Sequence, residues 1–262
     1  MKALNTVFAM FKTWIAPHLL VKFGDVGKYV LLPGDPGRAH RIAGFLKDAK
    51  LISHNREFVV YTGYYGEAKV SVVSTGIGGP STAIALEELI RVGGEVFIRV
   101  GTCGALQKGI KIGAIVIPYA AVRLNGVTKR YIEPEYPAVA HPLIYHSLVE
   151  ASRNLKVQAI TGIIVSEDAF YIEQSKLLYW SRKNIIAVEM EASTVFTIAS
   201  LKNKMAGAIL AVDGNIVEGT GKAVLGALGR KEYSEDVMKA IDLETKIALE
   251  AIRILESRKT VQ

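Results

Sequence analysis

The feature that most constrains the fold of this chain is the short apolar run at residues 96–100, Val-Phe-Ile-Arg-Val, and the turn that follows it. Apolar, β-rich runs of this length are typical of strands that are buried on both faces of a covered, mostly parallel sheet. Arg99 interrupts the run one residue before its end, and Gly-Thr-Cys-Gly follows at once. We therefore expect an α/β fold in which this strand ends at a polar site.

Arg99 itself requires a partner. A guanidinium is almost never buried alone, because its desolvation must be offset by an anion and by hydrogen bonds. The turn that follows can supply backbone N–H groups and the Thr102 hydroxyl to an oxyanion, at the sheet edge where α/β proteins bind their ligands. Two interpretations stay open on this segment alone. Arg99 binds an anionic ligand, or it forms a structural ion pair with a buried carboxylate.

The rest of the chain alternates strand-like and helix-like segments. Strands are expected at residues 29–32, 58–62, 69–74, 95–100, 114–118, 160–166 and 208–212, with a further strand-like run at 185–188. Helices are expected at residues 38–46, 81–92, 142–154, 173–181, 191–201 and 234–258. This alternation favours a single domain over residues 1–262 with a mostly parallel, covered sheet. Residues 120–141 and 214–232 are expected to be loops that cover a substrate.

Composition narrows the class of protein. The 262 residues are 50% hydrophobic, enough for a large core. The single cysteine, Cys103, excludes an intramolecular disulfide and fits a reducing compartment. Without a membrane-length apolar run or a convincing signal peptide, we expect a cytoplasmic protein with no membrane partner. The net charge of +7 is scattered among acidic residues, so we expect no nucleic-acid partner.

A first motif occupies residues 32–38, Leu-Pro-Gly-Asp-Pro-Gly-Arg. Asp35 is placed to cap a helix, and Pro36 suits the first helical position. The N–H groups at such a helix start, with Arg38 beside them, form an anion site. A plain strand–helix turn explains the glycine, the aspartate and the proline but not Arg38, which would then be a surface residue.

A second motif, Ser-Thr-Gly-Ile-Gly-Gly-Pro-Ser, lies at residues 74–81. It is superficially similar to a dinucleotide fingerprint, but the glycine spacing differs and no acidic residue ends the following strand, so we reject binding of NAD. Close packing of these glycines against a ligand or a neighbouring backbone is the better explanation.

A third motif, Ala-Val-Glu-Met-Glu-Ala-Ser at residues 187–193, places two carboxylates where a strand meets a helix. Glu191 suits the helix dipole, which is its structural explanation. The functional interpretation is that it accepts hydrogen bonds from a vicinal diol such as ribose, with Met190 packed on the sugar. Paired carboxylates also fit glycoside hydrolysis or metal binding. The arginines at two other strand ends favour an anionic co-substrate instead.

Taken together and in this order, the motifs resemble the nucleoside phosphorylase family, which includes uridine phosphorylases and the hexameric-type purine nucleoside phosphorylases. The similarity runs from about residue 18 to the C-terminus, and its details are nearer to the uridine enzymes. It implies a three-layer α/β/α fold around a mixed, partly barrel-like sheet. It also implies a homo-oligomer of dimers with shared active sites, usually a hexamer. The implied reaction converts a nucleoside and inorganic phosphate to a free base and ribose 1-phosphate, with no cofactor and no metal.

The resemblance assigns roles to matching residues. The implied phosphate ligands are Gly34, Arg38, Arg56, Arg99 and Thr102. The implied ribose contacts are His18, Glu189, Met190 and Glu191. The implied catalytic residues are Arg38, Arg99, Glu191 and Asp213. In the family, the residues that match Arg56 and His18 serve a neighbouring subunit. Without the resemblance, His18 would be taken for a surface residue.

The base-binding residues decide the substrate. The resemblance implies the set Cys103, Gly104, Phe170, Gln174 and Lys176. Phe170 and Gln174 match the uridine enzymes, whereas Lys176 stands where they have an arginine. Phe170 also fits core packing, and Gln174 also fits an ordinary surface position. Purine enzymes carry a Ser-Asp pair after a late strand, and here Asp213 takes the place of the serine and Gly214 that of the acid.

We therefore expect phosphorolysis of uridine, with a purine nucleoside or 5′-methylthioadenosine phosphorylase as the alternative. Related nucleosidases use water, and they lack the phosphate-binding arginines that Arg38 and Arg99 match. A catalytically silent nucleoside-binding protein is the other class considered, but such a protein has no need of a phosphate site.

Overall fold

We describe the fold from a computed structural model, in which residues 13–220 and 234–259 are described. The strands are β1 (Tyr29–Leu32), β2 (Lys47–Asn55), β3 (Phe58–Tyr65), β4 (Ala68–Val73), β5 (Val96–Ala105), β6 (Ile115–Arg123), β7 (Ala138–Val139), β8 (Ile160–Ser166), β9 (Ala187–Glu189) and β10 (Met205–Asn215). The helices are α2 (Pro36–Ala43), α3 (Gly79–Arg91), α4 (Thr128–Tyr131), α5 (Pro142–Asn154), α6 (Gln174–Ser181), α7 (Ala192–Leu201) and α9 (Glu235–Lys259).

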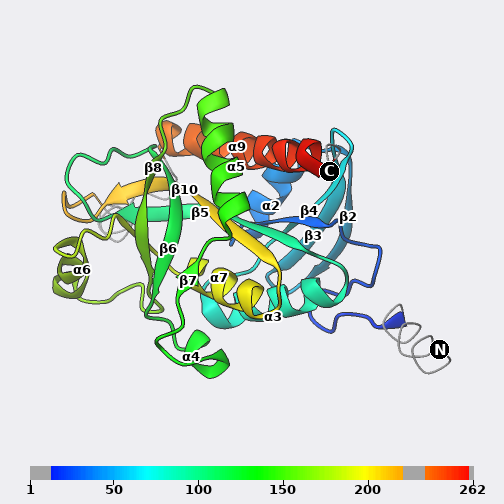
Figure 1. Cartoon of the computed structure of the whole chain (residues 1–262), viewed down its shortest axis with the longest axis horizontal. Coiled ribbons are helices and arrows are strands. Elements are labelled where there is room, and N and C mark those ends of the chain that lie inside the picture. The colour runs from blue at the N-terminus through cyan, green and yellow to red at the C-terminus, as the bar shows by residue number, and fades with distance from the viewer. Residues whose placement is uncertain (1–12, 221–233, 260–262) are drawn as a thin grey trace.

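The described strands form one mixed sheet that closes on itself along half of its length (Figure 1). The strand order is β10-β6-β8-β9-β5-β1-β4-β3-β2, and β10 also pairs with β5. That extra pairing closes five strands, β5, β10, β6, β8 and β9, into a barrel. The other strands, β1, β4, β3 and β2, continue from β5 as an open sheet. The predicted mixed, partly barrel-like sheet is confirmed.

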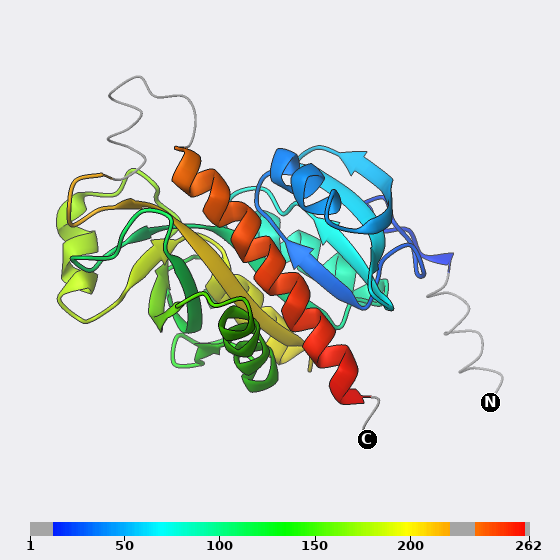
Figure 2. The ribbon, with the colours of Figure 1, turned by 90° about the horizontal axis from the view of Figure 1, so that it is seen from above.

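Helices cover both faces of this sheet, which gives the predicted three layers. Alternate residues of a strand point to opposite faces. Phe97 of β5 accordingly packs in the core beneath α3 and α7, and its neighbour Ile98 packs in the core beneath α2, α5 and α9. Figure 2 shows α9 crossing the sheet diagonally beside α2. The carboxyl ends of β1, β4 and β5 meet at the centre of this arrangement, which makes that edge the natural place for a site.

The strand–helix turn after β1 is built as its residues predict. The Asp35 side chain accepts a hydrogen bond from the backbone N–H of Arg38 at 2.7 Å, and Pro36 occupies the first turn of α2. The helix therefore begins at Pro36, two residues earlier than the apolar pattern suggests. Asp35 is the N-cap that sets this start.

The segment 120–141, expected to be a loop, contains regular structure. Strand β6 runs on to Arg123, and α4 and β7 follow. The Arg123 guanidinium donates hydrogen bonds to the backbone carbonyls of Thr128, Ile132, Glu133 and Tyr136. One half-buried side chain thus organises the whole turn. In the other expected loop, residues 214 and 215 belong to β10, and residues 221–233 lie outside the described residues.

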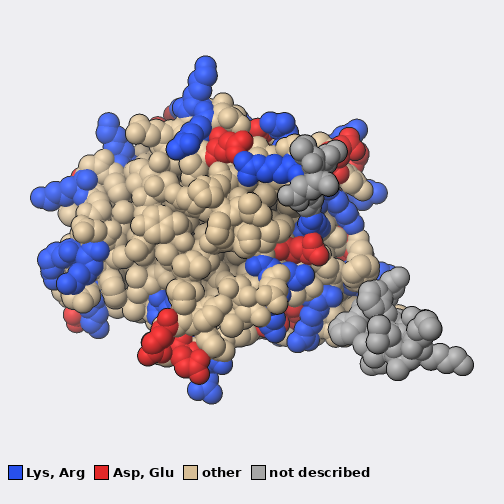
Figure 3. All heavy atoms as spheres, in the orientation of Figure 1, with Lys and Arg blue, Asp and Glu red and all other residues tan. Residues whose placement is uncertain are grey.

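Charged side chains are spread over the surface. On the face shown in Figure 3, Lys and Arg lie mostly around the rim and are interspersed with Asp and Glu. This matches the scattered charge of the sequence. Within the described ranges, none of the helices has both the length and the apolar character needed to cross a membrane.

Gly207 of β10 allows α5 to pack closely on the sheet. A Cβ at this position would lie 2.5 Å from Cγ2 of Ile144, which is fully buried. We predict that Gly207→Ala destabilises the protein by about 1–3 kcal/mol, because the added methyl overpacks the core. The measurement is thermal unfolding at fixed protein concentration. In the Gly207→Ala/Ile144→Ala double variant, the two losses should be less than additive. Full additivity would contradict the proposed contact.

Candidate active site

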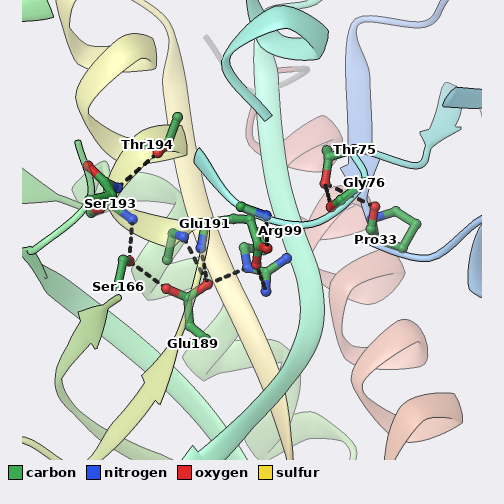
Figure 4. Close-up of polar contacts among 12 residues, drawn as sticks. Pro33, Thr75, Gly76, Arg99, Ser166, Glu189, Glu191, Ser193 and Thr194 are labelled. Carbon is green, nitrogen blue, oxygen red and sulfur yellow. Dashed lines mark hydrogen bonds and ion pairs between the residues drawn. The ribbon is translucent and has the colours of Figure 1, made fainter. Parts of the chain in front are cut away.

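The centre of the site is a buried ion-pair cluster around Arg99 of β5 (Figure 4). Its Nε donates to Oε2 of Glu189 at 2.7 Å, and its Nη2 lies 2.5 Å from Oε2 of Glu191. The Arg99 side chain is 6% exposed and that of Glu189 is 1% exposed. Of the two interpretations of Arg99, the ion pair with buried carboxylates is thus present in the structure. The binding of an anion by the same guanidinium stays a prediction.

Gly101, two residues further along β5, makes room for this guanidinium. A Cβ at Gly101 would lie 3.0 Å from Cζ and Nη2 of Arg99. Side chains two residues apart on a strand share one face, so any larger residue here would compete for the space of the guanidinium. The glycine that follows Val100 in the sequence is therefore part of the site.

Glu189, the last residue of β9, joins the arginine to helix α7. Its Oε1 accepts a hydrogen bond from the Ser166 hydroxyl at 2.5 Å. Its Oε2 accepts the backbone N–H groups of Glu191 and Ala192, at 2.8 and 2.9 Å, in addition to the Arg99 bond. The favourable interaction with the start of α7, which the sequence suggested for Glu191, is therefore made by Glu189. Glu189 thus accepts four hydrogen bonds, which tie β5, β8 and the start of α7 together.

Glu191 connects two motifs that lie far apart in the sequence. Its Oε1 accepts the backbone N–H of Gly78 at 2.6 Å, so the 74–81 turn is tied to the 187–193 turn. Gly78 has φ of 88°, in the left-handed region that favours glycine. Burial raises the pKa of the Glu191 carboxyl, and Arg99 opposes that shift. Met190, between the two glutamates, is half-buried.

The ends of β1 and β4 are held together beside this cluster. The N–H of Thr75 donates to the Pro33 carbonyl at 2.9 Å, and the N–H of Gly76 donates to the Gly34 carbonyl at 3.0 Å. Arg38 is half-buried on α2, just beyond this junction. Both Arg38 and Arg99 interact electrostatically with the same buried carboxyl, that of Glu244. The structure thus brings together the arginines from two separate motifs. Thr102, also predicted as a phosphate ligand, follows in β5 and is half-buried.

His18 and Arg56 form a second cluster. Nδ1 of His18 lies 2.6 Å from Oε1 of Glu88, whose carboxylate also accepts the backbone N–H of His18. Arg56 is exposed at the β2–β3 turn in the left-handed region, with φ of 55°. The pKa of Glu57 is lowered, first by its own backbone N–H and then by the Ser81 hydroxyl, Arg56 and His18. Within the described chain, no hydrogen bond or ion pair joins His18 or Arg56 to Arg99.

A cavity of about 420 Å³ adjoins this second cluster. Its lining is mainly apolar and includes His18 and Glu88, together with Trp14, Pro80, Ile84 and Tyr131. The cluster therefore faces a hollow surface that is separate from the Arg99 ion pairs.

Two of the predicted base-binding residues, Gln174 and Gly104, lie next to Ile216, which follows the last residue of β10. The Gln174 side-chain amide donates to the Ile216 carbonyl at 3.0 Å. A Cβ at Gly104 would lie 3.0 Å from Cδ1 of Ile216. Phe170 is 48% exposed and packs edge-on against Tyr171, so in this chain its ring is not a core residue. Lys176 is exposed on α6.

Asp213 is the extra residue of a β-bulge. The register between β10 and β5 shifts there, so that Val212 pairs with Cys103 and Gly214 pairs with Gly104. The bulge leaves the Asp213 side chain buried near Cys103. Burial raises the pKa of the Cys103 thiol, and Asp213 raises it further.

Three residues of the site were not predicted from the sequence: Ser166, Glu88 and Glu244. Ser166 ends a strand that was predicted correctly, but its bond to Glu189 depends on the closure of the barrel. Glu88 and Glu244 are acidic residues at buried positions of α3 and α9. An acidic residue in the core-facing phase of a helix is the signal that could have found them.

The comparisons with known proteins agree with this geometry. Residues 28–253 match the model of the phosphorylase superfamily. A guanosine phosphorylase of Halorubrum lacusprofundi is 43% identical over 240 residues, which cover 91% of this chain and 98% of that protein. A uridine phosphorylase of Thermococcus kodakarensis is 41% identical over 240 residues, covering 86% of this chain and 85% of that protein. A crystal structure of purine nucleoside phosphorylase from Toxoplasma gondii, in complex with immucillin-H, has a TM-score of 0.84 and 32% identity, covering 93% of this chain and 97% of that one.

The chain therefore belongs to the phosphorylase superfamily. Within it, the chain is a nucleoside phosphorylase, an enzyme that transfers a pentosyl group, as the resemblance of its motifs predicts. The similar proteins are named for guanosine, uridine and purine nucleosides, so membership leaves the base open.

Glu189 should be the most sensitive carboxylate of the cluster. We predict that Glu189→Ala lowers the free energy of unfolding by about 3–5 kcal/mol, because Arg99 then loses a buried partner and the start of α7 loses its acceptor. Urea unfolding followed by circular dichroism measures this. The control is Glu235→Ala on the exposed start of α9, which should change stability by less than about 0.5 kcal/mol. Equal effects of the two variants would contradict the role given to Glu189.

Proposed function

We propose that this enzyme converts uridine and inorganic phosphate to uracil and ribose 1-phosphate. The observation that carries the proposal is the convergence of Arg38 and Arg99 next to the paired carboxylates of Glu189 and Glu191. Guanidinium groups suit the oxygens of phosphate, and carboxylates suit the hydroxyls of ribose. The two halves of the reaction therefore meet at one sheet edge.

The chemistry requires little beyond positioning and charge. A phosphate oxygen attacks C1′ of the ribose, and the bond from C1′ to N1 of the base breaks with its electron pair going to the base. The proton of hydrogen phosphate balances the charge of the departing uracil. Arg38 and Arg99 hold the dianion beneath C1′, where its charge stabilises the oxocarbenium-like transition state. Glu191 accepts the ribose hydroxyls and so fixes the sugar above the phosphate.

Gln174 supports uracil as the base. A side-chain amide offers one donor and one acceptor, which matches the paired O2/N3 or O4/N3 edge of uracil. Gln174 lies at the start of α6 next to Ile216, on the same side as Gly104 of β5. Lys176 adds a positive charge near the same helix start but lacks the planar fork of an arginine.

A purine nucleoside is the second candidate, and the bulge at Asp213 favours it. Bulges re-aim side chains next to active sites. This one places a buried carboxyl beside Cys103, where it can carry a proton to a purine ring nitrogen. The similarity to a guanosine phosphorylase supports the same alternative.

We further propose that the active site is shared between subunits of a homo-oligomer built from dimers. His18 and Arg56 support this, because they cluster with Glu57 and Glu88 rather than with Arg99. A second copy of the chain can then receive both side chains in its own site. A hexameric assembly and a cytoplasmic location stay predictions from the sequence.

The first test concerns phosphate. We predict that the purified protein releases uracil from uridine only when phosphate is present, since the arginines position phosphate and not water for attack. The assay separates the released bases by chromatography for uridine, guanosine, inosine, adenosine and methylthioadenosine, each with and without phosphate. Release at the same rate in phosphate-free buffer would contradict phosphorolysis. Faster cleavage of a purine nucleoside than of uridine would replace uridine by the second candidate.

The second test concerns the base. We predict that Gln174→Ala lowers kcat/KM for uridine by about tenfold or more and that for any purine nucleoside by much less, because only the pyrimidine edge uses the amide. Gln158→Ala is the matched control, since Gln158 is an exposed glutamine of the same chain. Equal losses for both classes of substrate would show that Gln174 does not recognise the base.

A further inference from the structure

Glu244 is a buried acid that the reaction described above does not use. It lies on α9 between the core residues Ile241 and Ala248 and is fully buried. Among the described residues, no group forms a hydrogen bond of ordinary geometry with either of its carboxylate oxygens. The backbone N–H of Ala211 approaches the carboxyl and favours its charged form without completing such a bond. A carboxylate in this state is costly unless something else compensates it.

The charged groups that act on Glu244 belong to the proposed phosphate site and its surroundings: Arg38 on α2, Arg99 on β5 and Asp213 on β10. The Cys103 thiol is also within range of its charge. The residues two positions to either side of Glu244 contact Arg41 of α2 and Phe45 just after it, and the Ala211 N–H near the carboxyl belongs to the residue that pairs with Thr102 of β5. Glu244 therefore lies against the face of the sheet that α9 covers, next to the elements that carry Arg38 and Thr102. Burial raises the pKa of the Glu244 carboxyl well above its ordinary value, Arg38 and Arg99 oppose the shift, and Asp213 adds to it.

The charged neighbours of Glu244 on its own helix have other partners. Asp242 forms an ion pair with Arg41, with 2.6 Å between Nε and Oδ1. Lys246 lies over the ring of Phe45. The charge that Glu244 experiences therefore comes from the site and not from α9.

The charges around Arg38 and Arg99 show why the protonation of Glu244 matters for the binding of an anion. Within one subunit, the two guanidinium groups of Arg38 and Arg99 are surrounded by more carboxyl groups than they can neutralise: Glu189, Glu191, Asp213 and Glu244. A dianion added to four ionised carboxylates would meet net repulsion in a poorly hydrated site. Glu189 accepts four hydrogen bonds, whereas neither oxygen of Glu244 has a hydrogen-bond partner of ordinary geometry among the described residues. Glu244 is thus a buried carboxyl whose charge is not stabilised by such a bond, and it can lose that charge readily.

We propose that Glu244 borders the phosphate site and that the site binds an anion only while this carboxyl is protonated and therefore neutral. A neutral Glu244 removes the repulsion and turns a bare carboxylate into an O–H donor beneath the anion. When the carboxyl starts out ionised, binding of the anion takes up one proton there. The inference rests on the proposed function, because it concerns the same phosphate site.

The consequence is a linkage between anion affinity and pH. Above the pKa that Glu244 has in the ligand-free protein, anion affinity falls about tenfold for each pH unit, because an ever smaller fraction of the protein carries the proton. Below that pKa, the affinity is independent of this group. Glu244→Gln imitates the neutral acid, so its anion affinity should stay level over the same range.

The test uses sulfate, because its two charges do not change over the pH range in which phosphate itself titrates. Calorimetric titration of the whole chain with sulfate, at rising pH and in two buffers of different ionisation enthalpy, counts the protons taken up. We expect uptake that approaches one proton in the wild type and none at Glu244→Gln. The control is Glu235→Gln, at an exposed position of the same helix, and it should behave as the wild type does. Cys103→Ser should keep the uptake, which separates the carboxyl from the nearby thiol.

Other outcomes would contradict the role of Glu244, the proposed function or both. Sulfate binding without proton uptake in the wild type at any pH overturns the role of Glu244, and so does an unchanged pH dependence at Glu244→Gln. If Glu244→Gln does not fold, the proton count of the wild type and of Cys103→Ser decides the matter. Phosphate-dependent release of a base together with either negative result leaves the proposed function intact. If neither sulfate nor phosphate binds and release of the base is independent of phosphate, both proposals fall.

Discussion

The buried ion pair between Arg99 and Glu189 is the interaction on which the rest of the site depends. It joins the buried strand β5 to the turn that starts α7. Glu191 extends the pair to the backbone of Gly78, so three motifs spread over more than a hundred residues meet at one point. Removing one partner of such a pair destabilises the protein far more than replacing both partners by apolar residues, because the remaining charge stays buried.

The position of β5 explains why these motifs can meet. This strand belongs both to the closed barrel, through β9 and β10, and to the open sheet, through β1. Helix α2, which follows β1 of the open sheet, contributes Arg38, which suits an anion. Strand β9 of the barrel and the turn after it contribute the glutamates, which suit a sugar. A strand shared by two halves of a sheet places chemically opposite groups within reach of one substrate. The fold thus provides the adjacency, and the side chains provide the chemistry.

Much of the fold was predictable from local pattern, and the failures have physical causes. The bounds of β1, β8 and α5 follow from apolar runs and turn residues, and the need of Arg99 for a partner follows from desolvation. Strand β2 was not predicted, because nearly all its residues are exposed and the sequence shows no alternation of apolar and polar residues there. The bulge at Asp213 and the neighbours of Glu244 arise from pairings between distant segments, which no local pattern contains. The identity of the base depends on such details, so uridine stays a prediction.

Strand β2 also bears on how the protein avoids sticking to itself. Closure removes free edges from the barrel, but the open half of the sheet ends at β2, which pairs only with β3 among the described strands. An unprotected edge can recruit a strand from another chain. The charged residues Lys47, Asp48 and Lys50 line this one, and the backbone at Asp48 is left-handed, with φ of 54°, where the pairing is irregular. The features that hide β2 from pattern recognition are the same ones that protect the molecule from edge-to-edge aggregation.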